Sequence, residues 1–213
     1  MASKHGGNQH SGSNHLPLDW NALYSGTPPW DIGRPQRPFI ELAETGDLSG
    51  SVLDVGCGTG ELALLMAESG LQATGVDVAP AAVATAMDKA QQRGLHARFL
   101  EHDALTVDAL DETFDVVLDC GFFHVLSDAD RVRFAEVLRR VTRPGARYFM
   151  LCFSDQVPGD AGPRRVSQNE IRSTFADGFA VEEIRQAYFE ATFLTQLVPA
   201  WLVQLVRVPN EFD

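Results

Sequence analysis

The chain has 213 residues, 45% of them hydrophobic, which suits one domain with a substantial core. Its formal net charge of −12 argues against a general nucleic-acid-binding surface. Cys57, Cys120 and Cys152 are odd in number and lack paired spacing, so they indicate neither a disulfide framework nor a metal site. No apolar run reaches the roughly 18 residues of a membrane span. We expect a cytoplasmic monomer or homodimer with no metal, nucleic-acid or membrane partner.

The first 50 residues fall into two segments. Residues 1–15 are polar, rich in Gly, Ser, Asn and His, and lack the apolar core of a signal peptide, so they predict a disordered tail. Metal binding by its histidines is the alternative to a merely solvated tail. Residues 16–50 contain several prolines and aromatic residues and are too apolar for a linker. They predict an arm or lid that precedes a main domain at 51–213.

From residue 51 onward, strand and helix patterns alternate. We expect strands at Ser51–Val55, Gln72–Asp77, His96–Leu100, Phe114–Asp119, Ala146–Phe153, Phe179–Phe189 and Trp201–Val208. We expect helices at Glu61–Ser69, Pro80–Arg93, from the N-cap Ser127 to about Val141, and at Val166–Phe175. This order predicts an α/β fold in which helices cover both faces of a mostly parallel sheet. The last two strands have no helix between them, which suits a hairpin with an antiparallel final strand.

A glycine-rich loop carries the argument for function. Gly56, Gly58 and Gly60 separate the first strand from the first helix, an arrangement that lets the backbone approach a ligand closely. A dinucleotide fingerprint needs its third glycine at position 61, where this chain has Glu61. Pyrophosphate disfavours a nearby carboxylate, whereas S-adenosylmethionine (SAM) has a sulfonium, an ammonium and no phosphate. Asp54 and Glu61 therefore suit SAM.

Two further carboxylates end or follow strands at the same edge of the predicted sheet. Asp77, followed by Val78, ends the second strand and is placed to accept both ribose hydroxyls. The alternative is an aspartate that caps the next helix, and the two roles are compatible. Asp103 follows the third strand, where it is placed to accept the adenine amino proton while Ala104 offers a backbone amide. The alternative is a local turn.

The run Asp54-Val55-Gly56-Cys57-Gly58-Thr59-Gly60 resembles the signature of class I SAM-dependent methyltransferases. The resemblance covers roughly residues 50–155. It implies a Rossmann-like fold with a seven-stranded sheet in which only the last strand is antiparallel, and SAM as the cofactor.

Three segments resemble the thiopurine and thiol/halide methyltransferase group: Thr27–Pro35, Phe114–Phe123, and Ser154–Pro163 with the Val-Ser pair at 166–167. In that group, aromatic residues upstream of the first strand cover the SAM, which implies this role for Trp20, Tyr24 and Trp30. An aromatic face attracts a sulfonium and excludes water. Tyr24 stands where plant halide-type members have tryptophan, and its spacing to Trp30 is one residue shorter. Anchoring the arm to the core is the alternative role.

The segment after the fourth strand is where the methyl group is expected. Cys120 and Gly121 would lie against the cofactor, Gly121 because it allows close approach. His124 is the candidate general base, with a structural histidine as the alternative. The candidate acceptor contacts are Phe123, Arg164, Arg165 and Tyr188. For the aromatic residues the alternative is the core, and for the arginines it is holding a loop to an acidic surface.

These features predict SAM-dependent methyl transfer to a sulfur, oxygen or nitrogen atom of a small molecule. A thiol, phenol or aromatic heterocycle is expected, in detoxification or secondary metabolism. No Asn-Pro-Pro-Tyr or Asp-Pro-Pro-Tyr segment follows the fourth strand, which argues against the amino-group methylases of DNA and of protein glutamine. The alternatives are a methyltransferase acting on carbon, nucleic acid or protein, and a non-catalytic SAM-binding regulator.

Overall fold

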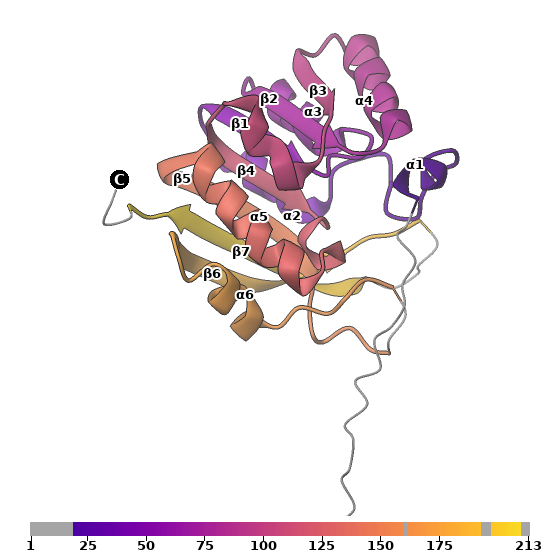
Figure 1. The fold of residues 1–213 in the computed structure, drawn as a ribbon. Coiled ribbons are helices and arrows are strands. Elements are labelled where there is room, and N and C mark those ends of the chain that lie inside the picture. Colours follow the sequence, from indigo (N-terminus) through magenta and orange to yellow (C-terminus); the bar gives the residue numbers. More distant parts are fainter. Residues whose placement is uncertain (1–18, 160–161, 193–196, 210–213) are drawn as a thin grey trace, which may run out of the picture.

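The structure is a computed structural model that describes residues 19–159, 162–192 and 197–209 (Figure 1). The tail predicted at 1–15 lies outside these residues. The strands are β1 (Ser51–Val55), β2 (Gln72–Asp77), β3 (Ala97–Glu101), β4 (Phe114–Cys120), β5 (Thr142–Phe153), β6 (Phe179–Phe189) and β7 (Val198–Arg207). The helices are α1 (Trp20–Leu23), α2 (Arg37–Glu44), α3 (Glu61–Glu68), α4 (Pro80–Arg93), α5 (Asp128–Val141) and α6 (Gln168–Thr174), with 3₁₀ turns η1 (Ala104–Leu110) and η2 (Phe123–Val125).

All seven strands form one sheet in the order β3-β2-β1-β4-β5-β7-β6. The pairs from β3 to β5 are parallel, and β7 runs antiparallel to both β5 and β6. The predicted fold class is therefore confirmed, including the antiparallel last strand. The strand order reverses between β1 and β4, the point at which doubly wound sheets bind ligands beyond the carboxyl ends of their strands.

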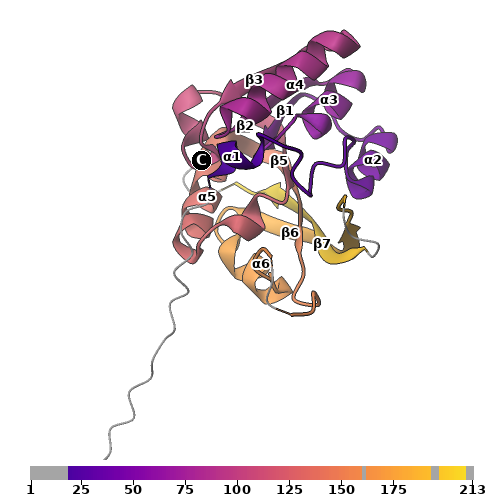
Figure 2. The ribbon, with the colours of Figure 1, turned by 90° about the vertical axis from the view of Figure 1, so that its right-hand side faces the viewer.

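The sheet is buried on both faces because alternate residues of each inner strand point to opposite sides. One core joins Leu53 and Val55 of β1 to buried residues of η1, α5 and α6. The other joins Val52 of β1 to buried residues of α2, α3 and α4. Figure 2 shows the second group of helices on one side of the sheet and α5 and α6 on the other.

Three predicted boundaries differ from the structure by two residues or more, each for a local reason. Strand β5 begins at Thr142 rather than at the predicted Ala146, because Thr142 already pairs with Phe114 before the register shifts. Helix α6 begins two residues late, since Ser167 is its N-cap and accepts a hydrogen bond from the amide of Glu170 at 3.2 Å. Strand β7 begins at Val198 rather than three residues later.

The arm contains the two helices α1 and α2, and it crosses from the glycine loop to the end of β6. The amide of Thr192 donates to the carbonyl of Pro29 at 2.9 Å. The side chain of Gln36 exchanges hydrogen bonds of 3.0 and 2.9 Å with the backbone of Glu190. Farther along, Phe39 of α2 is fully buried in the core beside α3. The arm is thus tied to the segment that follows β6 and to the core beside α3.

None of the helices in the described ranges is both long and apolar enough to cross a membrane.

Candidate cofactor and acceptor site

The glycine loop turns tightly against its neighbours. Gly58 and Gly60 have φ angles of +52° and +84°, a region that L side chains rarely adopt. A Cβ on Gly60 would lie 2.7 Å from the Cβ of Ala86 and 2.8 Å from the ring of Phe99. A Cβ on Gly58 would lie 2.7 Å from the Tyr24 hydroxyl oxygen. Both positions therefore require glycine, and Gly56 shares the positive φ, at +62°.

Asp77 ends β2 beneath this loop, as the sequence predicts. Its Oδ2 accepts a hydrogen bond from the amide of Gly58 at 2.8 Å, and its Oδ1 accepts one from the amide of Ala79 at 2.9 Å. Burial raises the pKa of this carboxyl, against the opposing effect of these amides. Each carboxylate oxygen has a second lone pair, so these two amide bonds leave acceptors for ribose hydroxyls. The neighbouring Val78 side chain is about half exposed.

Asp54 holds the helix that follows the loop. Its Oδ2 accepts a hydrogen bond from the amide of Ala63 at 3.1 Å, in the first turn of α3. Burial raises the pKa of Asp54 well above its ordinary value, and the charges of Asp119 and Asp77 add to the rise. Asp54 therefore positions the loop from beneath.

Glu61, the residue that excluded a dinucleotide site, faces α4. Its Oε1 forms ion pairs of 2.8 Å with both Lys89 and Arg93. Burial would raise the pKa of Glu61, but hydrogen bonds from Arg93 and Lys89 outweigh it and lower the pKa. Its charge is thus largely neutralised by these cations. The acidic environment assigned to it from sequence is weaker than expected.

The aromatic residues of the arm form one group beside the loop. Trp30 meets Trp20 and Tyr24 edge-on, with ring centroids 6.1 and 6.3 Å apart. The indole Nε1 of Trp30 donates to the Tyr24 hydroxyl at 3.0 Å. Burial raises the pKa of Tyr24, so its hydroxyl stays protonated. Because this hydroxyl also lies over Gly58, the three predicted cofactor-covering residues are brought together at the glycine loop.

A polar contact fixes the arm in this position. The Thr59 hydroxyl donates to Oδ2 of Asp31 at 2.9 Å, while Nζ of Lys89 donates to the same hydroxyl at 2.7 Å. The amide of Ala81, in the first turn of α4, donates to Oδ1 of Asn21 at 3.0 Å. Arm, loop and α4 are therefore joined at the carboxyl ends of β1 and β2, where Figure 1 shows α1.

Asp103 and Ala104 follow β3 at the same edge of the sheet. Asp103 is exposed and caps η1, with its Oδ1 accepting from the amide of Leu105 at 2.9 Å. The local turn considered as an alternative is therefore present. No described residue donates a hydrogen bond to Oδ2 of Asp103, so this oxygen can still accept one from a ligand. Ala104 is buried.

Asp119, near the end of β4, is a site residue that the sequence reasoning missed. It is fully buried and accepts hydrogen bonds from the amides of Phe122 and Phe123 at 2.8 and 3.0 Å and from the Tyr148 hydroxyl at 2.9 Å. Burial raises the pKa of Asp119 to about 7, although these donors oppose the rise. The available signal was an aspartate near the end of a buried strand, two residues before a glycine. Asp119 shapes the loop that carries Gly121.

Cys120 and Gly121 begin that loop. Burial raises the pKa of the Cys120 thiol well above its ordinary value, which makes it a poor nucleophile. Gly121 has a φ of +92°, and its amide donates to the carbonyl of Leu151 at 3.0 Å. A Cβ added to Gly121 would lie 3.3 Å from both Cε1 and Nε2 of His124. This edge of the imidazole ring therefore faces the glycine.

His124 is nearly buried, with 6% of its surface exposed. The amide of Phe153 donates to its Nδ1 at 3.0 Å. The rings of Phe153 and Phe189 lie 4.7 and 5.6 Å from the imidazole, centroid to centroid. We call Gly121, His124, Phe153 and Phe189 the aromatic enclosure. It stands beyond the carboxyl end of β4, next to the loop held by Asp119.

Three of the four predicted acceptor contacts have other partners in the structure. Phe123 is fully buried in the core, where it packs on Phe175 and beneath the guanidinium of Arg131, so its side chain is not open to a ligand. Arg164 is paired with Asp128 and Glu170. Arg165 donates hydrogen bonds to the backbone carbonyls of residues 157, 158 and 163. Tyr188, on β6, is half exposed. Both arginines therefore hold loop 154–167, the alternative that the sequence left open.

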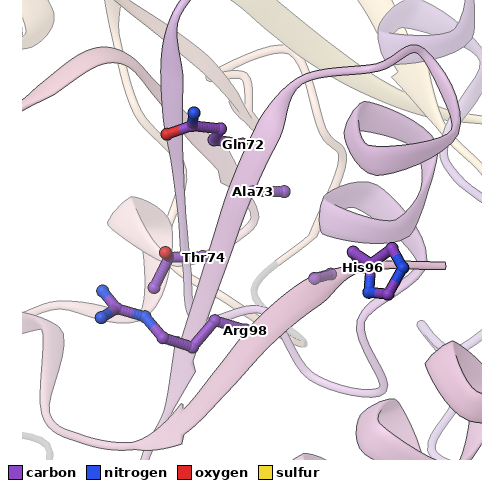
Figure 3. A pocket seen from close by; sticks show the side chains of 6 residues that line it. Gln72, Ala73, Thr74, His96 and Arg98 are labelled. Carbon is purple, nitrogen blue, oxygen red and sulfur yellow. The ribbon is translucent and has the colours of Figure 1, made fainter.

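A separate hollow lies at the opposite edge of the sheet. It is lined by the first residues of β2 and by the start of β3, including Gln72, Thr74, His96 and Arg98 (Figure 3). Asp77 lies at the other end of β2, and the glycine loop follows the carboxyl end of β1. This hollow is therefore unrelated to the candidate site.

The fold and the loop define a class I methyltransferase, and comparison with known proteins agrees. Residues 52–145 match the model of a methyltransferase domain family. The chain is 36% identical over 163 residues to a 2-heptyl-1-hydroxyquinolin-4(1H)-one methyltransferase of Mycobacteroides abscessus, a match that covers 75% of this chain and 72% of that protein. It is 30% identical to a probable thiol methyltransferase of Arabidopsis thaliana over 71% of this chain and 66% of that one.

Solved structures give the same result. A structure that concerns conversion of a disulfide bond into a thioacetal group during echinomycin biosynthesis is 35% identical, with a TM-score of 0.81 over 90% of this chain and 93% of that one. Magnesium protoporphyrin IX methyltransferase of Synechocystis, with bound SAM, shares the fold at 21% identity and a TM-score of 0.63, over 80% of this chain and 76% of that one. The chain belongs to the SAM-dependent methyltransferases, and its cofactor is SAM.

The residues present fit this cofactor. A Cβ at Gly58 would collide with the Tyr24 hydroxyl, so glycine lets the aromatic group of the arm lie directly against the loop. Asp77 offers acceptors beneath the loop, and the aromatic group of the arm offers faces suited to a sulfonium. Bound there, SAM supplies a methyl group already activated by positively charged sulfur.

Proposed function

We propose that this enzyme methylates a sulfur, oxygen or nitrogen atom of a small molecule such as a thiol, a phenol or an aromatic heterocycle. The observation that carries the proposal is the aromatic enclosure beside Gly121. It consists of two phenylalanine rings and an imidazole that pack on one another, and such an apolar aromatic surface suits a flat or apolar acceptor. The named activities of the relatives, on a hydroxyquinolone and on a thiol, support the same acceptor class.

The cofactor half of the site is assigned as follows. Asp77 accepts from the ribose hydroxyls, and Gly56, Gly58 and Gly60 let the loop backbone approach the cofactor. Asp103 and Ala104 receive the adenine edge. Trp20, Tyr24 and Trp30 cover the cofactor as a lid and exclude water. The hydrogen bonds within the arm and between the arm and the glycine loop support this role, because they hold the lid over the loop.

Catalysis in this assignment rests on alignment. Methyl transfer is an in-line displacement, so the enclosure must hold the acceptor atom opposite the departing sulfur. Gly121 permits close approach because it has no side chain, and Asp119 fixes its loop through backbone amides. Exclusion of water by the arm and the phenylalanine rings prevents competing solvation of the nucleophile.

Transfer of a radiolabelled methyl group from SAM tests this proposal. The purified protein is incubated with thiols, phenols and N-heterocycles, and in parallel with RNA and protein. Label in one or more small-molecule classes is expected. Label only in macromolecules, or only on carbon, would contradict the proposal, and SAM binding without turnover over the whole panel would favour a regulator.

A further inference from the structure

The hydrogen bond between Phe153 and His124 determines which imidazole nitrogen bears the proton. A backbone amide can only donate, so Nδ1 of His124 must present its lone pair to the amide of Phe153 at 3.0 Å. A neutral imidazole has one N–H, which then lies on Nε2. Phe153 belongs to β5, so the sheet itself fixes this tautomer.

The protonated nitrogen faces the acceptor side of the site. Nε2 and Cε1 form the ring edge nearest Gly121. Among the described residues, Nε2 of His124 has no hydrogen-bond partner. The fully buried side-chain atoms without a partner are on Arg131 and Arg207, so Nε2 itself keeps some exposed surface. An N–H donor therefore remains unused beside the position at which methyl transfer is proposed.

From this geometry we infer that His124 is a hydrogen-bond donor to the methyl acceptor through Nε2–H, and that the enzyme selects acceptors whose reacting atom is already ionised. The inference rests on the proposed function and deepens it. It replaces the general-base role predicted from the sequence, because a nitrogen that already bears a proton has no lone pair to take another.

The surroundings of the ring keep it neutral. Burial lowers the pKa of His124 to about 3, and the positive charge of Arg131 on α5 adds to this effect. The neighbours from β5 and β6 are the phenylalanine rings Phe153 and Phe189, and Gly121 flanks the ring from the loop after β4. No carboxylate in the described residues pairs with the imidazole.

The chemistry balances without an enzyme base. The acceptor anion, a thiolate, phenolate or comparable oxyanion, donates an electron pair to the methyl carbon. The carbon–sulfur bond breaks, and its pair stays on sulfur, which becomes a neutral thioether. No proton moves in this step. The Nε2–H bond to the anion is charge-assisted, so it favours the ionised acceptor and orients its reacting atom.

Nitrogen NMR of ¹⁵N-histidine-labelled protein tests the tautomer without acceptor or turnover. The His124 resonances are assigned by their loss in His124→Asn. We expect Nε2 protonated and Nδ1 unprotonated from pH 5 to pH 9. A proton on Nδ1, or an imidazolium forming between pH 6 and pH 7, would overturn the inference.

Kinetics with matched acceptors test the donor role. Thiophenols or phenols of graded acidity should give pH profiles of kcat/KM whose midpoints follow each acceptor's own pKa. A single midpoint common to all acceptors would indicate an enzyme base and would overturn the inference.

The His124→Asn variant separates the two nitrogens. Its side-chain oxygen can still accept from the Phe153 amide, but the side chain is too short to replace Nε2–H. We expect kcat/KM for the acceptor to fall at least about tenfold, as for a lost hydrogen bond to a charged group. The dissociation constant for SAM should change less than about twofold. Wild-type kcat/KM in a folded variant would contradict the inference.

His124→Gln provides a second variant if the first does not fold. Its longer amide can place an N–H near the position of Nε2, so it should retain more activity than His124→Phe, which cannot donate. Equal activity in these two variants would contradict a donor role. A protein inactive on the entire acceptor panel would instead count against the proposed function, because the NMR measurement stands without it.

Discussion

The two halves of the site are built by different means. In the cofactor half, buried carboxylates hold the glycine loop and the helix after it by accepting backbone amides, as Asp77 and Asp54 do. In the acceptor half, rings from separate elements pack around Gly121, and one backbone hydrogen bond orients His124. The first arrangement fixes loop backbone for a constant ligand. The second is made of side-chain surfaces, which can vary with the acceptor while the cofactor half stays the same.

The largest effect on stability is expected from adding a side chain to the glycine loop. Gly60→Ala would impose a side chain at positive φ and bring its Cβ within 3 Å of Ala86 and Phe99. Strain and overpacking together should lower the free energy of unfolding by roughly 3 kcal/mol. Denaturant unfolding measures this loss. Gly70→Ala is the matched control, because Gly70 has a φ of +83° with nothing within 4 Å of an added Cβ. Equal losses in both variants would show that packing at the loop is unimportant.

The second effect concerns the carboxylate shared by both halves. Asp119→Asn would turn an amide nitrogen toward the backbone or tyrosine donors, and we expect a loss of about 2 kcal/mol in unfolding free energy. Tyr148→Phe should cost less, because it leaves both backbone bonds in place.

The cost of this substitution should depend on pH. The pKa of Asp119 in the folded protein is about 7, above the ordinary 3.8, so between these values the folded state holds a proton that the unfolded state has lost. The contribution of Asp119 to stability therefore falls as pH rises from 4 to 7. The stability difference between wild type and Asp119→Asn should shrink over that range. A constant difference would contradict the raised pKa.

A smaller change tests whether the halves act independently. Phe189→Leu removes a ring that borders His124, and we expect about 1 kcal/mol of lost stability. Acceptor kcat/KM should fall, because the enclosure widens, while SAM affinity stays within about twofold of wild type. Isothermal titration and steady-state kinetics measure the two quantities. An equal fall in SAM affinity would contradict the claim that the two halves of the site act independently.

The smallest effect is expected at the arm. Tyr24→Phe removes the hydroxyl that accepts from Trp30 and lies over Gly58. SAM affinity should fall about two- to tenfold, as for the loss of one hydrogen bond. Tyr188→Phe, on β6, is the control. A rise in SAM affinity would mean that Tyr24 obstructs the cofactor rather than covering it.

The cofactor half could be predicted from sequence because its signals are local. Glycines at alternate positions and an aspartate that ends the next strand specify backbone geometry within about 25 residues, from Asp54 to Asp77. The roles of Asp119 and His124 could not be predicted in this way. Asp119 meets Tyr148 and His124 meets Phe153, each 29 residues away and on another strand.

Two predicted acceptor contacts have partners that the sequence could not indicate, for the same reason. Phe123 follows a strand at the correct edge, but η2 turns its ring into the core against Phe175. Arg164 lies in a loop and has no partner evident from sequence, yet it pairs with Asp128 of α5 and Glu170 of α6. Such partners are chosen by tertiary packing, which a linear pattern does not encode.

The central claim, that the glycine loop and Asp77 hold SAM, is tested most directly by calorimetric titration of SAM into wild type and Asp77→Ala. Wild type should bind, and the folded variant should bind at least about 1 kcal/mol more weakly, a roughly fivefold rise in Kd, because the ribose loses its acceptors. Asp103→Asn should change the Kd less. Unchanged SAM affinity in folded Asp77→Ala would contradict this account of the site.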